Sequence, residues 1–288
     1  MVYDGPILDN HFHLNRRGLF LSAARDFQRC GGTDLVLVHC PDFVSPPVSL
    51  SGHQEAYADT IDMAQTLRTE LGLEVRVILG PHPAAFAHQF ENWVTQLGEE
   101  GEEKAIENYR HSIDAALHFV HEGQAHGIGE VGRPHWPVSS EVWDLSNMLL
   151  EETMHMAAQE GIALQLHVEG EQDDTYPDLA GRAIRQGMDL VKLVRHYSPP
   201  DVRAAHTHGL TPSVLCGKGA LEVLLETHTS SSHGFLMETD YMDDPRRPGA
   251  VLGPKTVPKR TQQLIDAGIG EEVLWNTHDE LPRRIYGQ

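Results

Sequence analysis

The stretch that decides the fold lies near the start of the chain and reads Ile7-Leu8-Asp9-Asn10-His11-Phe12-His13. It begins as an apolar run and ends in two histidines that are one residue apart. Side chains of a β-strand alternate between its two faces, so His11 and His13 would point the same way. Two imidazoles on one face at a strand end make half of a metal site. A lone His-x-His pair is equally consistent with ordinary, partly buried histidines, so its meaning depends on what recurs downstream.

Seven more apolar, β-rich runs follow along the chain. With the first run, the expected strands are Ile7–Asn10, Leu35–Val38, Val75–Leu79, Gly127–Val131, Ala163–Leu166, Leu190–Val194, Thr211–Leu215 and Phe235–Thr239. Helical signals fill most intervals, and several of them end at a glycine. The expected helices are Leu19–Cys30, His53–Leu71, Phe86–Leu97, Glu102–Gly123, one capped by Ser140 that runs to Glu160, Pro177–Gln186, Ala220–Thr227 and Lys255–Ala267. The charged, glycine-interrupted stretch from Gly98 to Lys104 is expected to be a solvated loop.

Strands that alternate with helices predict a parallel sheet. At 288 residues this pattern favours a single α/β (β/α)8 barrel, the TIM barrel, with residues 1–288 forming one domain. An open, doubly wound sheet is the alternative.

The charge balance is strongly acidic. The chain has 22 Lys and Arg against 42 Asp and Glu, a net charge of −20, and only five of its basic residues are lysines. This composition excludes a broad basic face for sequence-independent binding of nucleic acid. It is typical either of an ordinary acidic, soluble protein or of one adapted to a salty, halophile-like cytoplasm.

Other features narrow the class of protein. Cys30, Cys40 and Cys216 are too few and too scattered for a disulfide framework or a Cys-based zinc site. No run is apolar enough to span a membrane, and the N-terminus lacks the basic and apolar regions of a signal peptide. We therefore expect a soluble cytoplasmic protein, and no obligate protein partner is evident.

Residues of metal-ligand type recur at or just past the ends of the expected strands. They are His11 and His13 after strand one, Glu130 after strand four, His167 after strand five, His196 after strand six and Asp240 after strand eight. In a barrel, the carboxyl ends of the strands meet at one mouth, where functional groups collect. Four imidazoles and two carboxylates suit Zn²⁺ or Mn²⁺ better than Ca²⁺, which prefers oxygen ligands alone. Six ligands exceed the needs of one four-coordinate ion, so two ions bridged by Glu130 are the simplest hypothesis.

The same residues resemble the motifs of the TatD-type metal-dependent hydrolases, a family within the amidohydrolase superfamily. The matching segments are Asp9-x-His11-x-His13, His82-Pro83, Gly129-Glu130-Val131-Gly132, His167, His196-Tyr197-Ser198, Glu238-Thr239-Asp240, and the tail from Val273-Leu274-Trp275-Asn276 to Ile285-Tyr286. The resemblance covers nearly the whole chain. It implies a TIM barrel, a divalent metal centre and hydrolysis, and many members of the family are known as deoxyribonucleases.

The chain departs from the family pattern at positions on the substrate side. The family usually has Leu-Asp after the glutamate motif, where this chain has Arg133-Pro134-His135, and commonly has an arginine where this chain has Glu169. These departures leave the metal chemistry intact and the natural substrate open. His82, Arg133 and Lys255 are the candidates for binding substrate, and the two cations would do so through phosphate oxygens.

From these features we expect a divalent-metal-dependent hydrolase, a TatD-like phosphodiesterase or deoxyribonuclease that uses a metal-activated water and two ions of Zn²⁺, Mn²⁺ or Mg²⁺. In the expected arrangement His11, His13 and Asp240 hold one ion, His167 and His196 hold the other, and Glu130 bridges them. Asp240 would also take up and return the proton. The alternatives are an amidohydrolase-superfamily enzyme that cleaves an amide, lactone or phosphotriester, and a metal-binding protein without turnover.

Overall fold

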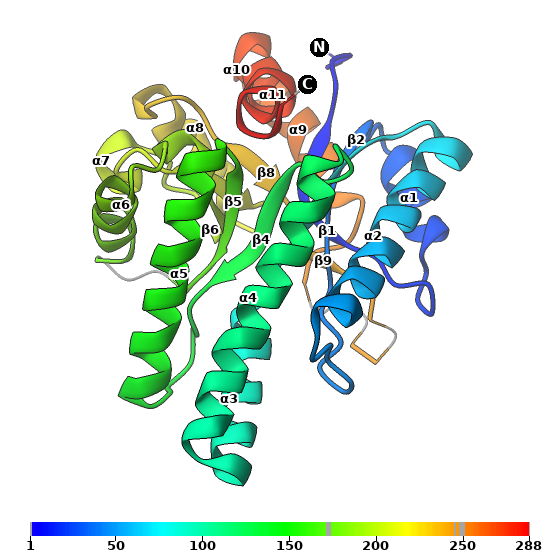
Figure 1. Cartoon of the computed structure of the whole chain (residues 1–288). Helices are drawn as coiled ribbons and strands as arrows, with labels where there is room; N and C mark the ends of the chain where they lie inside the picture. Colours follow the sequence, from blue (N-terminus) through cyan, green and yellow to red (C-terminus); the bar gives the residue numbers. More distant parts are fainter. Residues whose placement is uncertain (1, 171–173, 245, 248–250, 288) are drawn as a thin grey trace.

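The computed structural model describes residues 2–170, 174–244, 246–247 and 251–287. Within these residues, nine parallel strands form one sheet in the order β8-β7-β6-β5-β4-β3-β2-β1-β9. The sheet curls into a barrel with helices around its outside (Figure 1). β8 pairs with β7, while β9, which follows β8 after Thr239 and Asp240, pairs with β1. The eighth passage of the chain thus closes the ring, and the α/β TIM barrel expected from the alternation of elements is confirmed.

The strands begin and end close to their expected positions. They are β1 (Leu8–His13), β2 (Asp34–Val38), β3 (Glu74–Leu79), β4 (Gly127–Gly132), β5 (Ala163–His167), β6 (Leu193–Ser198), β7 (Thr211–Leu215), β8 (Leu236–Glu238) and β9 (Tyr241–Met242). The expected start of the sixth strand is wrong, because Leu190–Lys192 form a 3₁₀ turn (η1). The Asp189 side chain caps this turn by accepting a hydrogen bond from the backbone N–H of Val191 at 3.0 Å. His196 therefore lies within β6 and not after it.

The helices also follow the expected order. They are α1 (Leu21–Gln28), α2 (Leu50–Leu71), α3 (Pro83–Leu97), α4 (Glu99–His121), α5 (Ser140–Glu160), α6 (Thr175–Gln186), α7 (Ala204–Thr207), α8 (Ala220–Thr227), α9 (Thr256–Asp266), α10 (Glu271–Trp275) and α11 (Leu281–Tyr286), with a 3₁₀ turn at η2 (His228–Ser230) and a short π-helix at η3 (Asn276–Glu280). The cap of α5 is Ser139, whose hydroxyl accepts a hydrogen bond from the backbone N–H of Val142 at 3.2 Å, and not Ser140 as expected.

The acidic stretch that was expected to be a loop forms the first turns of α4. α3 ends at Gly98, which has φ 65° and ψ −135°, and α4 begins at the next residue. Glycine adopts this backbone conformation without the steric penalty of a side chain. Glu99, Glu100 and Glu102 lie in the first turn of α4, where negative charge is favoured by the helix dipole.

The two ends of the barrel differ in character. α10 and α11 cover the end at which both termini lie (Figure 1). Inside that end, Leu281, Ile285 and Tyr286 of α11 pack with apolar strand residues such as Leu8 and Ala163. The apolar plug leaves the opposite half of the barrel interior to polar side chains.

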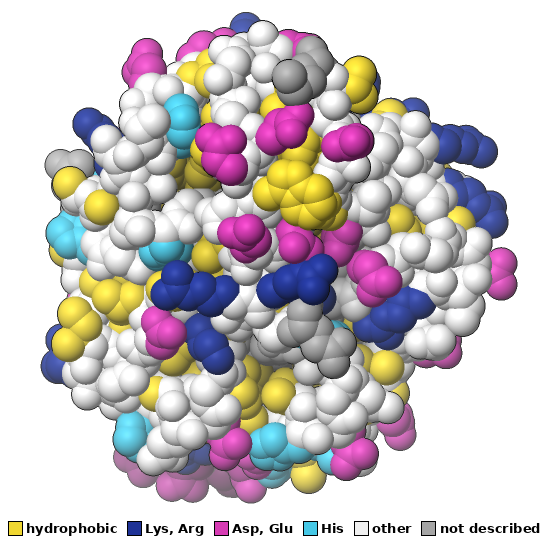
Figure 2. All heavy atoms as spheres, turned by 90° about the horizontal axis from the view of Figure 1, so that it is seen from above, with side chains coloured by type: hydrophobic (Ala, Val, Ile, Leu, Met, Phe, Trp, Pro, Cys, Tyr) yellow, Lys and Arg dark blue, Asp and Glu magenta, His cyan; other side chains and the backbone are white. Residues whose placement is uncertain are grey.

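Figure 2 shows the end at which both termini lie, where Lys and Arg side chains are interspersed among Asp and Glu. This mixture agrees with the acidic composition and is not a broad basic face. Among the helices of the described residues, none is both long enough and apolar enough to cross a membrane.

Candidate metal centre

Three strands lose their regular register where they carry candidate ligands. The shifts lie between Asp9 and Phe12 in β1, between Ile128 and Val131 in β4, and between Arg195 and Ser198 in β6. Such irregularities re-aim side chains at the rims of barrels and beside active sites. Each irregular segment contains one ligand-type residue, namely His11, Glu130 or His196.

One half of the cluster surrounds the Oε1 atom of Glu130. This oxygen lies 3.4 Å from Nε2 of His11 and 3.2 Å from Nε2 of His13. Oδ1 of Asp240 lies 3.8 Å from each of these two nitrogens. Two imidazoles and two carboxylates thus converge on a space that one metal ion can fill.

The other half of the cluster surrounds the Oε2 atom of the same carboxylate. This oxygen lies 2.6 Å from Nδ1 of His167, 3.3 Å from Nε2 of His196 and 3.6 Å from Nε2 of His82. The two halves touch directly, because the rings of His11 and His196 stack at a centroid distance of 4.0 Å. Glu130 is the residue that both halves share.

The outer nitrogens of two histidines determine what their inner nitrogens offer. Nδ1 of His11 lies 2.9 Å from Oε1 of Gln165, and Nδ1 of His13 lies 3.0 Å from the carbonyl oxygen of Val38. Both partners are acceptors, so in the neutral rings the protons are on Nδ1. The two Nε2 lone pairs then face each other at 3.0 Å and repel unless a cation or a proton joins them. This arrangement fits a metal ion, whose histidine ligands usually donate their other N–H to a protein oxygen.

The electrostatics of the cluster also favour added positive charge. Burial alone would raise the pKa of Glu130, but the neighbouring histidines, first of all His11, hold it well below its usual range. Burial alone would lower the pKa of His196, but Glu238 and Glu130 raise it well above its usual range. Burial raises the pKa of Asp240 to about 7. Carboxylates that draw protons onto a buried histidine attract a divalent cation for the same reason.

Asp240 reaches the cluster from the break between β8 and β9. Its φ is 49°, a left-handed conformation that Asp adopts more readily than most residues. Asp9 holds this break in place, because its carboxylate accepts hydrogen bonds from the backbone N–H of Thr239 at 3.0 Å and from the Thr239 hydroxyl at 2.7 Å. Asp9 therefore supports the position of Asp240, which explains its place in the opening motif.

Comparison with known proteins agrees with this geometry. Residues 8–287 match the family model described as TatD related DNase. The chain belongs to this family. The resemblance inferred from the motifs is thereby confirmed, and family and fold together identify a metal-dependent hydrolase.

A curated relative and solved structures with the same fold cover nearly the whole length of the chain. The uncharacterized protein MJ1127 of Methanocaldococcus jannaschii is 30% identical over an alignment of 287 residues that covers 98% of this chain and 95% of the relative. The TatD-like protein of Archaeoglobus fulgidus superposes with a TM-score of 0.59 at 14% identity, covering 97% of this chain and 99% of that one. The phosphotriesterase homology protein of Escherichia coli, solved with phosphate in its active site, gives 0.60 at 13% identity and covers 98% of both chains.

Arg133 is a departure from the TatD pattern, and the structure does not bring it to the cluster as expected. Its guanidinium is buried and donates to Glu169 through Nη2 and through Nε, the latter at 2.7 Å, and to Asp178 through Nη1. The ring of Trp143 lies 4.8 Å from the guanidinium carbon. The two departures, Arg133 and Glu169, are thus partners in one ion pair. An arginine held in this way has no free fork for a substrate phosphate.

The other two expected substrate residues separate from each other. Lys255 pairs with Asp26 at 3.1 Å, and both side chains are exposed, so the structure places this lysine in an ion pair and not in the cluster. His82 joins the cluster. Its Nδ1 accepts a hydrogen bond from the backbone N–H of Ala84 at 3.0 Å and so caps α3. Nε2 then carries the proton and faces Glu130, so this ring is suited to donate to a substrate oxygen and not to bind a metal.

The supporting roles of two residues, Gln165 and Glu238, were not recognised from the sequence, although Glu238 belongs to the matched Glu238-Thr239-Asp240 segment. Gln165 accepts from Nδ1 of His11, and Oε1 of Glu238 accepts from Nδ1 of His196 at 3.1 Å. Each is a polar residue inside an otherwise apolar expected strand, which is the signal that could have revealed them.

His135 is a third supporting residue that the sequence did not reveal as such. Its Nδ1 lies 3.1 Å from Nε2 of His167, the outer nitrogen of that ring. His135 is exposed and follows β4 in a short irregular segment. Its position depends on how that segment folds, so no pattern in the sequence could place it.

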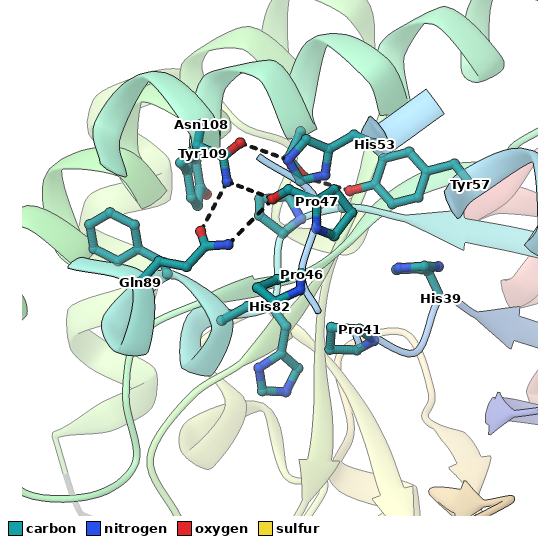
Figure 3. Close-up of a pocket in the computed structure, with 15 residues that line it drawn as sticks. His39, Pro41, Pro46, Pro47, His53, Tyr57, His82, Gln89, Asn108 and Tyr109 are labelled. Atoms are coloured by element: carbon teal, nitrogen blue, oxygen red, sulfur yellow. Dashed lines mark hydrogen bonds between the residues drawn. The ribbon is translucent and has the colours of Figure 1, made fainter. Parts of the chain in front are cut away.

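A pocket opens beside the cluster between His39 and His82 (Figure 3). It has an empty volume of about 450 Å³, part of it open to solvent, and its lining includes prolines of the segment after β2. Asn108 lies at the end away from His82, where it donates to the carbonyl oxygen of Pro47 at 3.1 Å and lies 3.1 Å from Nε2 of His53. The segment after β2 is thereby attached to α4 at the end of the pocket that lies away from the cluster.

Proposed function

We propose that this TatD-family chain is a divalent-metal-dependent phosphodiesterase that holds two ions at the mouth of its barrel. The observation that carries the proposal is the position of Glu130. One of its oxygens faces His11 and His13, and the other faces His167 and His196. A carboxylate placed between two sets of imidazoles is suited to bridge the ions of a two-metal hydrolytic site.

The side chains divide into roles by their positions. His11, His13 and Asp240 would hold one ion, and His167 and His196 would hold the other, each being Zn²⁺, Mn²⁺ or Mg²⁺. When bound, such ions would make a water molecule more acidic, for Zn²⁺ from a pKa of 15.7 to as low as about 7, and would stabilise negative charge on a phosphoryl oxygen.

Asp240 and His82 can also act on the substrate, in addition to the binding of metal ions by the residues above. The Asp240 carboxylate is the group at the mouth that can accept a proton and return it to the leaving group. The Nε2–H of His82 is directed at the same region and can donate to a substrate oxygen.

The charge of the chain favours a small substrate. A net charge of −20 repels a long polyanion, and Arg133 and Lys255 are both paired with carboxylates. A nucleotide or a strand end of DNA fits this environment better than a long duplex. The same observation supports the alternative, an uncharged lactone, amide or phosphotriester, because such a substrate needs no arginine or lysine side chain for its binding.

A screen of substrate classes tests the proposal. Metal-depleted protein is reloaded with Mn²⁺ and offered bis(p-nitrophenyl) phosphate, dinucleotides, a phosphotriester, lactones and amides. We expect turnover of the phosphodiesters, its loss with a chelator and its return with added metal. Turnover of lactones, amides or the phosphotriester without any phosphodiester would replace the proposal by its alternative. Metal-replete protein that turns over none of them would be a binding protein.

A further inference from the structure

A chain of hydrogen bonds runs beneath the cluster and joins its two halves. Its members, in order, are His11, Gln165, Tyr286, Asn10, Ser213, Glu238 and His196. All of them are buried, and they come from five strands and from α11. Tyr286 is contributed by the last helix, which covers the far end of the barrel in Figure 1.

The first half of the chain has a fixed direction. Nδ1 of His11 donates to Oε1 of Gln165, so the amide nitrogen of Gln165 faces away and donates to the Tyr286 hydroxyl at 2.8 Å. The same amide nitrogen donates to the carbonyl oxygen of Asn10 at 3.0 Å. Having accepted one bond, the Tyr286 hydroxyl donates its own proton to Oδ1 of Asn10 at 3.0 Å. Tyr286 is therefore one of the partners that fix the orientation of both amides.

The second half continues in the same direction. Nδ2 of Asn10 donates to the Ser213 hydroxyl at 3.0 Å, which leaves the serine proton for Oε2 of Glu238. Oε1 of Glu238 accepts from Nδ1 of His196 and from the backbone N–H of Tyr197 at 2.7 Å. Each side-chain donor along this path has an acceptor, so its direction is determined at every step. The chain ends by holding Nε2 of both His11 and His196 toward the cluster.

We propose that Tyr286 is a positioning residue for both halves of the metal centre. The inference rests on the proposed function, because the ions it concerns are the two proposed above. Without the hydroxyl, the amides of Gln165 and Asn10 each lose a partner. A Gln165 amide that turns over offers an N–H to Nδ1 of His11 and moves the ring proton to Nε2, the atom that would bind the ion. Loss of such outer partners typically weakens metal binding 10–100-fold.

The test is the Mn²⁺ affinity of metal-depleted protein, measured by calorimetry on the full chain. Tyr286→Phe and Ser213→Ala should each raise Kd about 10–100-fold. Because both variants interrupt the same path of hydrogen bonds, the double variant should raise Kd by clearly less than the product of the single effects. Tyr109→Phe is the matched control: its hydroxyl is also buried and lies 3.1 Å from the Thr153 hydroxyl, but it packs between outer helices, and its removal should leave Kd unchanged.

The possible failures can be told apart. A Tyr286→Phe protein that binds Mn²⁺ as tightly as the parent overturns the positioning role and leaves the metal centre standing. If the increases in Kd of the two single variants multiply in the double variant, the hydrogen bonds do not form one connected path. A parent protein that binds no Mn²⁺ overturns the proposed function and this inference together.

Discussion

Replacing Arg133 with Met should strongly destabilise the protein. The Arg133 side chain is 3% exposed and that of Glu169 is 9% exposed, and the two form a bidentate pair. Removal of the arginine leaves the Glu169 carboxylate buried without its main partner. Breaking a buried pair on one side typically costs about 3–5 kcal/mol, because a desolvated charge remains. The double variant Arg133→Met with Glu169→Leu removes that charge and should recover much of the loss.

The assay is urea unfolding followed by circular dichroism, with free energies compared at a constant slope m. It is made at pH 7. Burial alone would raise the pKa of Glu169, but Arg133 lowers it, so the stability it contributes is fully present above the ordinary value of about 4.3 and is lost on acidification. Arg110→Met is the control, because Arg110 makes a similar bidentate pair with Glu152 but the two side chains are 54% and 45% exposed, and its loss should cost less than about 1 kcal/mol.

The reasoning would be refuted by a specific result. An Arg133→Met protein within about 1 kcal/mol of the parent in stability, but with a raised KM for phosphodiesters, would show that the guanidinium binds substrate and not Glu169.

Three further predictions concern other parts of the chain. Burial lowers the pKa of His278 to about 4, so protonation of this ring opposes folding, and the free energy of unfolding should fall by about 2 kcal/mol through His278 between pH 7 and 5. Urea unfolding at the two pH values should show a smaller loss for His278→Gln than for the parent, and an equal loss would contradict this role of His278. Gly132→Ala should lower the melting temperature far more than Gly72→Ala, because a Cβ at Gly132 would lie 1.9 Å from the His167 carbonyl oxygen, whereas a Cβ at Gly72 would meet none of the described atoms within 4 Å. Equal losses would show that the contact relaxes. Asp240→Asn should reduce phosphodiester turnover about 10²–10⁴-fold while most bound metal is kept, and a rate near that of the parent would assign proton transfer to another group.

The barrel could be predicted because its evidence is local. Each strand is a short apolar run, and several helices end at a glycine, such as α2 at Gly72 and α5 at Gly161. The errors arose where the contact or the backbone conformation of a single residue decides the outcome. The cap by Asp189 delays β6, and the conformation of Gly98 lets the acidic run continue as helix. Propensity and periodicity carry no information about such contacts.

The cluster could be predicted because parallel strands bring their carboxyl ends to one mouth. This rule places His11 and Glu130 together although they are far apart in the chain. The rule says nothing of what an arginine or lysine in the segments after the strands will contact. Arg133 meets Glu169, and Lys255 meets Asp26, only because the fold brings these carboxylates near. Pairing of this kind depends on tertiary structure, so the sequence alone could not decide whether Arg133 and Lys255 are available to contact phosphate.

The number of Mn²⁺ ions bound per chain tests the central claim most directly. Metal-depleted protein is titrated with Mn²⁺, and the bound ions are counted for the parent and for Glu130→Ala. Because the two oxygens of Glu130 face the two halves of the cluster, we predict two ions per parent chain and a loss of bound metal in Glu130→Ala. A parent that saturates with one ion, or a Glu130→Ala protein that still binds two with parental affinity, would contradict the bridging role.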